Sequence, residues 1–205
     1  MSKSLGALLV IACALGPSNA AAGAEPGRGA QETLDPMAAT VVQWFTMIAQ
    51  SLVSLADAMP AEKYDFKPID GAFKDARTFG EQLKHVACGN IAFFNEIEKK
   101  APPDHCETGG PNPAKTKAEI VAYLRESFTY AGGVLRRMTV ANALDPAGGP
   151  YGGQSTRLGL TTLAVWHASD HYGQLVVYLR MNGLVPPASQ GGAATPPQER
   201  ARGDQ

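Results

Sequence analysis

The stretch that decides the fold is Trp166-His167-Ala168-Ser169-Asp170-His171-Tyr172-Gly173-Gln174, which lies in a proline-free run from Leu158 to Leu184. Apolar residues recur through this run with helical spacing, so we predict one long amphipathic α-helix. Its two histidines are four residues apart and fall on one face, about 40° apart around the axis and about 6 Å apart along it. That face also carries apolar residues expected in the core, namely Leu160, Leu163, Ala164, Leu175 and Tyr178.

Two imidazoles that point into a core need partners to replace the water they lose. A metal ion satisfies both rings at once, because histidine is the commonest side-chain ligand of metals in proteins. The alternative is a pair of histidines with ordinary polar neighbours. The spacing of His167 and His171 alone is compatible with either interpretation.

The chain has 205 residues, a mass of 21.5 kDa and a net charge of −1. This length predicts one domain with appendages. Lysine and arginine are scattered along the sequence, so we expect no binding to nucleic acid.

Residues 1–24 are typical of a signal peptide: Lys3 precedes an apolar run from Leu5 to Leu15, and small residues follow at plausible cleavage positions. This run is too short to span a bilayer, which takes about 20 residues. We therefore predict export to the periplasm or medium. The alternative is a lipoprotein anchored through Cys13, which would be the one route to a membrane. Two further cysteines, Cys88 and Cys106, form either a disulfide or two independent thiols.

After a flexible leader at 25–35, apolar periodicity predicts four helices within a domain at 36–187, followed by a disordered tail at 188–205. The first helix ends before Pro60. Thr78 with Glu81, and Thr116 with Glu119, match capping boxes that begin the second and third. The predicted helices span about 36–59, 78–100, 116–138 and 158–183. We find no strand signals, so the predicted fold is an all-α four-helix bundle, a fold that builds metal sites from inward side chains.

Two groups of motifs resemble DinB-like domains over residues 36–189. The first comprises Met59-Pro60-Ala61-Glu62-Lys63-Tyr64-Asp65-Phe66-Lys67-Pro68, Arg77-Thr78-Phe79-Gly80 and His85-Val86. The second comprises His167-x-x-Asp170-His171-Tyr172-Gly173-Gln174-Leu175, Leu179-Arg180-x-Asn182-Gly183 and Pro186-Pro187. The resemblance implies an up-and-down-related four-helix bundle, often a homodimer, with a divalent metal held by three histidines.

Carried onto this chain, the implied ligands are His85, His167 and His171, while His105 matches no ligand of the family. Three neutral ligands leave a coordination position open, as in catalytic zinc sites. Such a metal polarises a substrate oxygen or lowers the pKa of bound water toward about 7. Imidazole suits several ions; we expect zinc, with nickel or iron behind it.

We therefore predict an exported metal-dependent enzyme that carries out hydrolysis or group transfer on a small molecule. The weak catalytic candidates are Glu81, for which helix capping is the simpler role, and Gln174, three residues after His171. One alternative is a metal-binding or interaction module without turnover. Another is a thiol-dependent S-transferase, since the family includes enzymes that use bacillithiol or mycothiol; the predicted export disfavours it, because such thiols are kept reduced in the cytosol.

Overall fold

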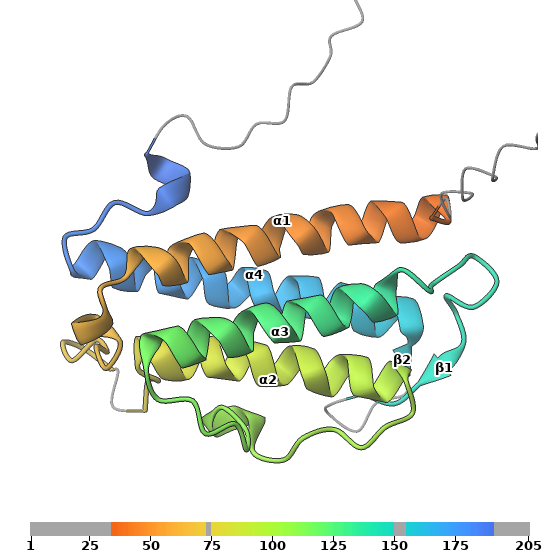
Figure 1. The fold of residues 1–205 in the computed structure, drawn as a ribbon, viewed down its shortest axis with the longest axis horizontal. Helices are drawn as coiled ribbons and strands as arrows, with labels where there is room; N and C mark the ends of the chain where they lie inside the picture. Colours follow the sequence, from red (N-terminus) through yellow and green to blue (C-terminus); the bar gives the residue numbers. More distant parts are fainter. Residues whose placement is uncertain (1–33, 73–74, 150–154, 191–205) are drawn as a thin grey trace, which may run out of the picture. The chain divides into compact units, whose positions relative to one another are not determined.

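The computed structural model describes residues 34–72, 75–149 and 155–190, and the unit that begins at Leu34 forms a four-helix bundle (Figure 1). The predicted signal peptide, Cys13 and most of the leader lie outside the described residues, as does the tail from 191. The long helices are α1 (Pro36–Ala58), α2 (Phe79–Ile97), α3 (Lys117–Leu135) and α4 (Arg157–Met181). Short 3₁₀ turns are η1 (Ala61–Lys63), η2 (Cys106–Thr108) and η4 (Pro187–Ser189).

The helices begin where their capping residues predicted. Thr78 accepts from the backbone N–H of Glu81, whose carboxylate accepts in return from the Thr78 N–H. Thr116 and Glu119 form the same reciprocal box at the start of α3. At the other end of the chain, Gly183 has a φ of +73° just past α4, a left-handed conformation that glycine adopts without a steric penalty.

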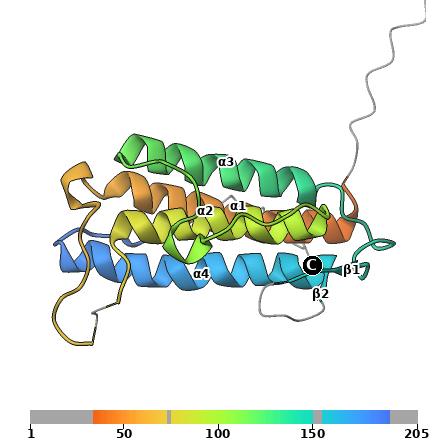
Figure 2. The same ribbon diagram turned by 90° about the horizontal axis from the view of Figure 1, so that it is seen from below.

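The connectivity departs from a simple up-and-down bundle. Figures 1 and 2 show that α2 and α3 run in the same direction, and both run opposite to α1 and α4. An ion pair between Glu98 and Arg137 joins the carboxyl ends of α2 and α3, as a parallel pair requires. The connection at 98–116 must therefore return along the full length of α2, about 28 Å for its 19 residues. This explains why that loop is so long, and it lays the loop against the outside of α2.

The apolar core lies between the helices and is closed by aromatic side chains. Phe45 of α1 contacts Phe94 of α2 and Phe128 of α3 edge-on, with ring centroids 5.6 and 5.2 Å apart. Tyr64 from the loop after α1 packs on Phe79 and donates to the Ala56 carbonyl. The loop is thereby held against the start of α2.

One detail differs from the sequence-based prediction of no strands, and a second concerns two glycines in α3. Pro146–Ala147 and Ser155–Thr156 pair as the short antiparallel strands β1 and β2, which are too short to leave a periodic signal. A methyl group added at Gly132 or Gly133 in α3 would meet no described atom within 4 Å, so these glycines do not mediate close helix packing. They only weaken the helix locally.

Candidate metal centre

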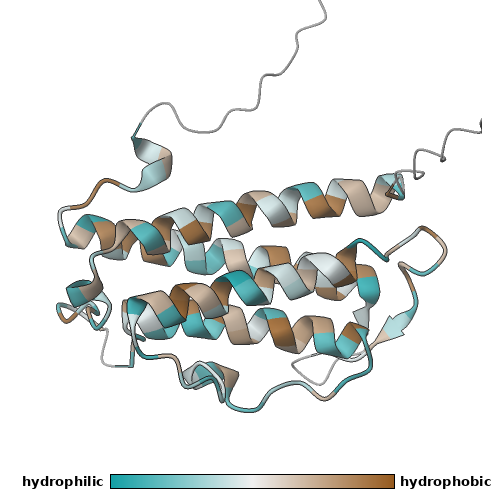
Figure 3. Ribbon diagram, viewed as in Figure 1, coloured by the Kyte–Doolittle hydropathy of each residue, from teal (hydrophilic) through white to brown (hydrophobic). Residues whose placement is uncertain are grey.

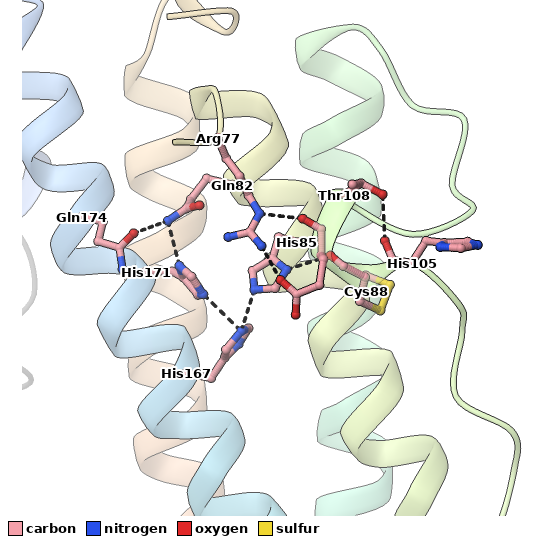
Figure 4. A network of polar contacts seen from close by, with 11 residues as sticks. Arg77, Gln82, His85, Cys88, His105, Thr108, His167, His171 and Gln174 are labelled. Carbon is pink, nitrogen blue, oxygen red and sulfur yellow. Dashed lines mark hydrogen bonds and ion pairs between the residues drawn. A yellow bond between two sulfur atoms is a disulfide. The ribbon is translucent and has the colours of Figure 1, made fainter. Parts of the chain in front are cut away.

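Three histidines meet between α2 and α4, which lie side by side and run antiparallel. His85 comes from α2, and His167 and His171 come from successive turns of α4. Each is only 7% exposed, and Figure 4 shows their rings turned toward one another. The Nε2 atom of His167 lies 3.0 Å from that of His85 and 3.1 Å from that of His171.

These distances are close to those of ligands around one ion. Two nitrogens bound at about 2.0–2.1 Å to one tetrahedral metal lie about 3.3–3.4 Å apart, so a shift of about 0.3 Å would admit the ion. The structure thus brings together the three predicted residues, while His105 lies apart in the loop before η2 and belongs to no such group among the described residues.

Without a cation, hydrogen bonding can satisfy only one of the two contacts between the rings. His85 Nδ1 lies 2.7 Å from the Cys106 carbonyl, which can only accept, so Nδ1 carries the hydrogen and Nε2 of the neutral ring presents a lone pair. His167 Nε2 faces two nitrogens, and one N–H cannot be directed at both. Its Nδ1 is buried without a hydrogen-bond partner among the described atoms. A divalent ion among the three lone pairs removes this conflict, so the residues present fit a metal.

Burial keeps the three rings neutral. Loss of hydration lowers the pKa of His167 to about 3 and that of His171 to about 4, and it lowers the pKa of His85 as well. Repulsion between the rings and the positive charge of Arg77 act in the same direction. Since metals bind the deprotonated ring, a site with these pKa values is ready for a cation at neutral pH.

A chain of side-chain amides surrounds His171. Asp170 accepts from Gln174 Nε2 at 2.8 Å, and Gln174 Oε1 accepts from Gln82 Nε2, which also lies 2.7 Å from His171 Nδ1. In this orientation Gln82 donates to Nδ1, which places the ring hydrogen on Nε2. Metal binding requires the Nε2 lone pair, so the Gln82 amide would have to turn its oxygen toward Nδ1, and the Gln174 amide would turn with it and give up its bond to Asp170.

The two catalytic candidates occupy different environments. Glu81 is exposed and its carboxylate is engaged in the helix cap. Gln174 is linked to His171 through Gln82, and its side-chain amide raises the pKa of that ring slightly against the effect of burial. No carboxylate of the described residues belongs to the histidine cluster.

Four groups that shape the histidine cluster were not assigned a role from the sequence. Gln82 of α2 contacts His171, and Arg77, which precedes the capping residue Thr78, places a positive charge near that ring. The Cys106 carbonyl orients His85. Gly89 makes room for His167: a Cβ there would lie 2.8 Å from Cε1 of the ring. Two of the four have a signal in the sequence: Arg77 lies in a family motif, and Gly89 is a glycine inside a helix about one turn after His85.

Arg77 is held beside the cluster by the loop that follows α2. Its Nε donates to the Glu107 carbonyl at 2.7 Å, and its guanidinium pairs with the Glu107 carboxylate. Tyr178 of α4 donates to the Arg77 carbonyl at 3.0 Å. Figure 4 shows the guanidinium near the rings of His85 and His171.

A helical bundle with three histidines directed to one interior point defines a class of potential metal-binding proteins. A family model described as the DinB superfamily matches residues 44–175, and the chain belongs to this superfamily. The family and the cluster together are compatible with a metal-binding function.

Solved structures share the fold. A DinB-like protein from Bacillus cereus ATCC 10987 aligns with a TM-score of 0.60 at 17% identity, covering 72% of this chain and 93% of that one. A DinB-like protein, YjoA, from Bacillus subtilis aligns with a TM-score of 0.55 at 20% identity, covering 70% and 92%. No curated protein matches the sequence at a significant level.

Proposed function

We propose that this protein is a metal-dependent enzyme that binds one divalent ion through His85, His167 and His171 and carries out hydrolysis or group transfer on a small molecule. The observation that carries the proposal is the convergence of three buried Nε2 atoms, two pairs of which lie 3.0 and 3.1 Å apart. Zinc is the proposed ion, since three imidazoles with an open position are a frequent ligand set of catalytic zinc; nickel and iron are the next candidates.

A divalent ion held by neutral ligands keeps its full charge and supplies Lewis acidity to a substrate oxygen or to water. The protein contributes the rest. Cys106 orients His85, and Gln82 orients His171. Burial lowers the pKa of both rings and so keeps them neutral. Arg77 adds a positive charge beside them, partly offset by Glu107. This charge favours a substrate that carries an anionic or strongly polar group.

A second candidate is a metal-binding module without turnover. The observation that favours it is the state of the acidic side chains near the cluster: Glu81 caps α2, and Asp170 accepts from Gln174. Neither is placed as a general base. Thiol-dependent group transfer is the third candidate, and it is weakened if the predicted export takes place.

Measuring the metal content of the purified protein distinguishes these metal-binding candidates from a protein in which the three histidines are only structural. We expect full-length protein to bind about one zinc per chain, and His85→Ala, His167→Ala and His171→Ala to bind it at least about 100-fold more weakly while remaining folded. His105→Ala is the matched control and should bind as the wild type does. Absence of a bound ion in the wild type after incubation with zinc, nickel or iron would overturn the proposal.

Turnover is then tested on the loaded protein. We expect cleavage of small esters, amides or phosphoesters that is abolished by a chelator and by His171→Ala, with anionic substrates preferred over neutral analogues. Activity only with an added low-molecular-weight thiol would favour the transferase. Stoichiometric binding with no turnover of any panel member would favour the module.

A further inference from the structure

The loop that returns from α2 is joined to that helix by a disulfide between Cys88 and Cys106. Cys88 is fully buried in α2, and Cys106 begins η2, with the two Cα atoms 5.2 Å apart and 18 residues apart in sequence. The disulfide resolves the alternative that the sequence left open. It also brings the loop beside the part of α2 that carries His85.

Cys106 makes a second contact with α2. Its carbonyl accepts from Nδ1 of His85 at 2.7 Å, while its sulfur is bonded to Cys88, three residues and about one helical turn after His85. One loop residue is thus attached to one face of α2 both covalently and through the hydrogen bond that determines the tautomer of a candidate ligand.

We propose that the Cys88–Cys106 disulfide is a positioning device for the metal centre, holding the Cys106 carbonyl against His85 so that the Nε2 lone pair faces His167 and His171. The inference rests on the proposed metal site. A hydrogen bond from the second ring nitrogen fixes the orientation and tautomer of a ligating histidine, and its loss typically lowers metal affinity about 10–100-fold. An untethered loop would have to order itself for each such contact, whereas the covalent bond keeps the carbonyl in place.

Other contacts hold the remainder of the loop. Lys84 donates to the carbonyls of Asn112 and Ala114, and Arg77 binds Glu107. Loss of the disulfide should therefore leave the loop near α2 and loosen chiefly the segment around Cys106. The expected result is a weakened site in a folded protein.

Metal affinity should consequently follow the oxidation state of the two sulfurs. Reduction by two equivalents of a monothiol adds two electrons and two protons, gives two cysteine thiols and releases the oxidised reductant as its own disulfide. The site would be complete only in compartments where disulfides persist, which agrees with the predicted export of the chain.

The test compares full-length oxidised protein with the Cys88→Ser/Cys106→Ser variant by competitive zinc titration, below the unfolding temperature of both. We expect an about 10–100-fold weaker zinc affinity in the double variant. The Leu124→Ala variant is the control for stability: it truncates a fully buried side chain of α3 and retains the disulfide, so its affinity should equal that of the wild type.

Nitrogen NMR of the metal-free protein reads the tautomer of His85 directly and does not depend on metal binding. We expect the Nδ1–H form in the oxidised wild type and in Leu124→Ala, and a mixture of tautomers in the double variant. An unchanged tautomer in the double variant would overturn the inference, as would an unchanged affinity. If the wild type binds no zinc, the proposed function fails, while the tautomer still decides whether the disulfide positions His85.

Discussion

Two buried regions of the bundle are built in opposite ways. The aromatic core, defined by Phe45, Phe94 and Phe128, has no polar atoms in its side chains and gains stability from contact alone. The histidine cluster between α2 and α4 is nearly as buried, yet its ring nitrogens face one another and one of them has no partner among the described atoms. Figure 3 shows that hydrophobic and hydrophilic residues are interspersed along the four long helices.

This difference indicates that the aromatic core contributes more to fold stability than the histidine cluster does. Burial of apolar surface contributes about 25 cal/mol per Å², whereas a buried polar group without a hydrogen bond costs free energy. The aromatic core therefore stabilises the fold, and under the proposed function a bound ion would offset the cost of the buried histidine nitrogens. Variants in the two regions should affect stability and metal binding separately.

The largest effect should come from the aromatic core. Phe94→Ala removes a fully buried ring that contacts Phe45, and we expect the free energy of unfolding to fall by about 3–5 kcal/mol. Chemical denaturation of the metal-free protein measures this loss. The folded fraction should retain one metal site per chain. A loss below about 1 kcal/mol would mean that this region is not the main source of stability.

The converse variant lies in the cluster. His171→Ala should weaken zinc binding by at least about 100-fold, beyond the usual effect of losing a hydrogen bond to a ligand. Its metal-free stability should fall by less than that of Phe94→Ala, because the ring is smaller and only its contacts with Gln82 and His167 are lost. Zinc titration and urea denaturation provide the two measurements. A destabilisation as large as that of Phe94→Ala would remove the contrast between the regions.

The pH dependence of the free energy of unfolding should come from the histidine cluster, because the side chains of the aromatic core do not titrate. The pKa of the rings is about 6.5 in an unfolded chain and is lowered by folding, to about 3 for His167 and about 4 for His171. Between these values the unfolded state binds more protons, so stability rises with pH and is lost as pH falls below about 6.5. The slope is at most about 1.4 kcal/mol per pH unit for each ring.

Denaturation of chelator-treated protein between about pH 7 and pH 5 measures this slope. His171→Ala should flatten it, and His105→Ala should leave it unchanged. A profile that does not change in His171→Ala would show that the ring is already protonated or solvated in the folded state.

A smaller change tests the shape of the cluster. Gly89→Ala places a methyl group 2.8 Å from Cε1 of His167, so the ring must shift, and we expect roughly tenfold weaker zinc binding. Gly132→Ala in α3 is the matched control: it meets no described atom within 4 Å and should stabilise the helix by about 0.5–1 kcal/mol with unchanged zinc affinity. Equal zinc affinity in the two variants would show that His167 does not need the space above Gly89.

The helices were predictable because their signals are local. The capping boxes at Thr78 and Thr116 and the left-handed Gly183 lie at helix ends whatever the rest of the chain does. The parallel arrangement of α2 and α3 was not predictable in this way, since helix direction within a bundle depends on contacts between distant segments. The expectation of an up-and-down-related bundle therefore missed the crossover at 98–116.

The site was predictable in part. His167 and His171 indicate a shared helix face by their spacing, whereas a single histidine in α2 has no such partner, and His85 was assigned only through the family resemblance. The Cys106 carbonyl could not be singled out because every residue has one, and only the fold brings it to His85. Gln82 likewise acquires its role from the packing of α2 on α4.

The central claim is that His85, His167 and His171 bind one ion together, and X-ray absorption at the zinc edge of loaded full-length protein tests it most directly. We predict a first shell containing three imidazole nitrogens at about 2.0–2.1 Å in the wild type, and two such nitrogens in His85→Ala. A first shell without histidine, or one that is identical in His85→Ala and the wild type, would contradict the account.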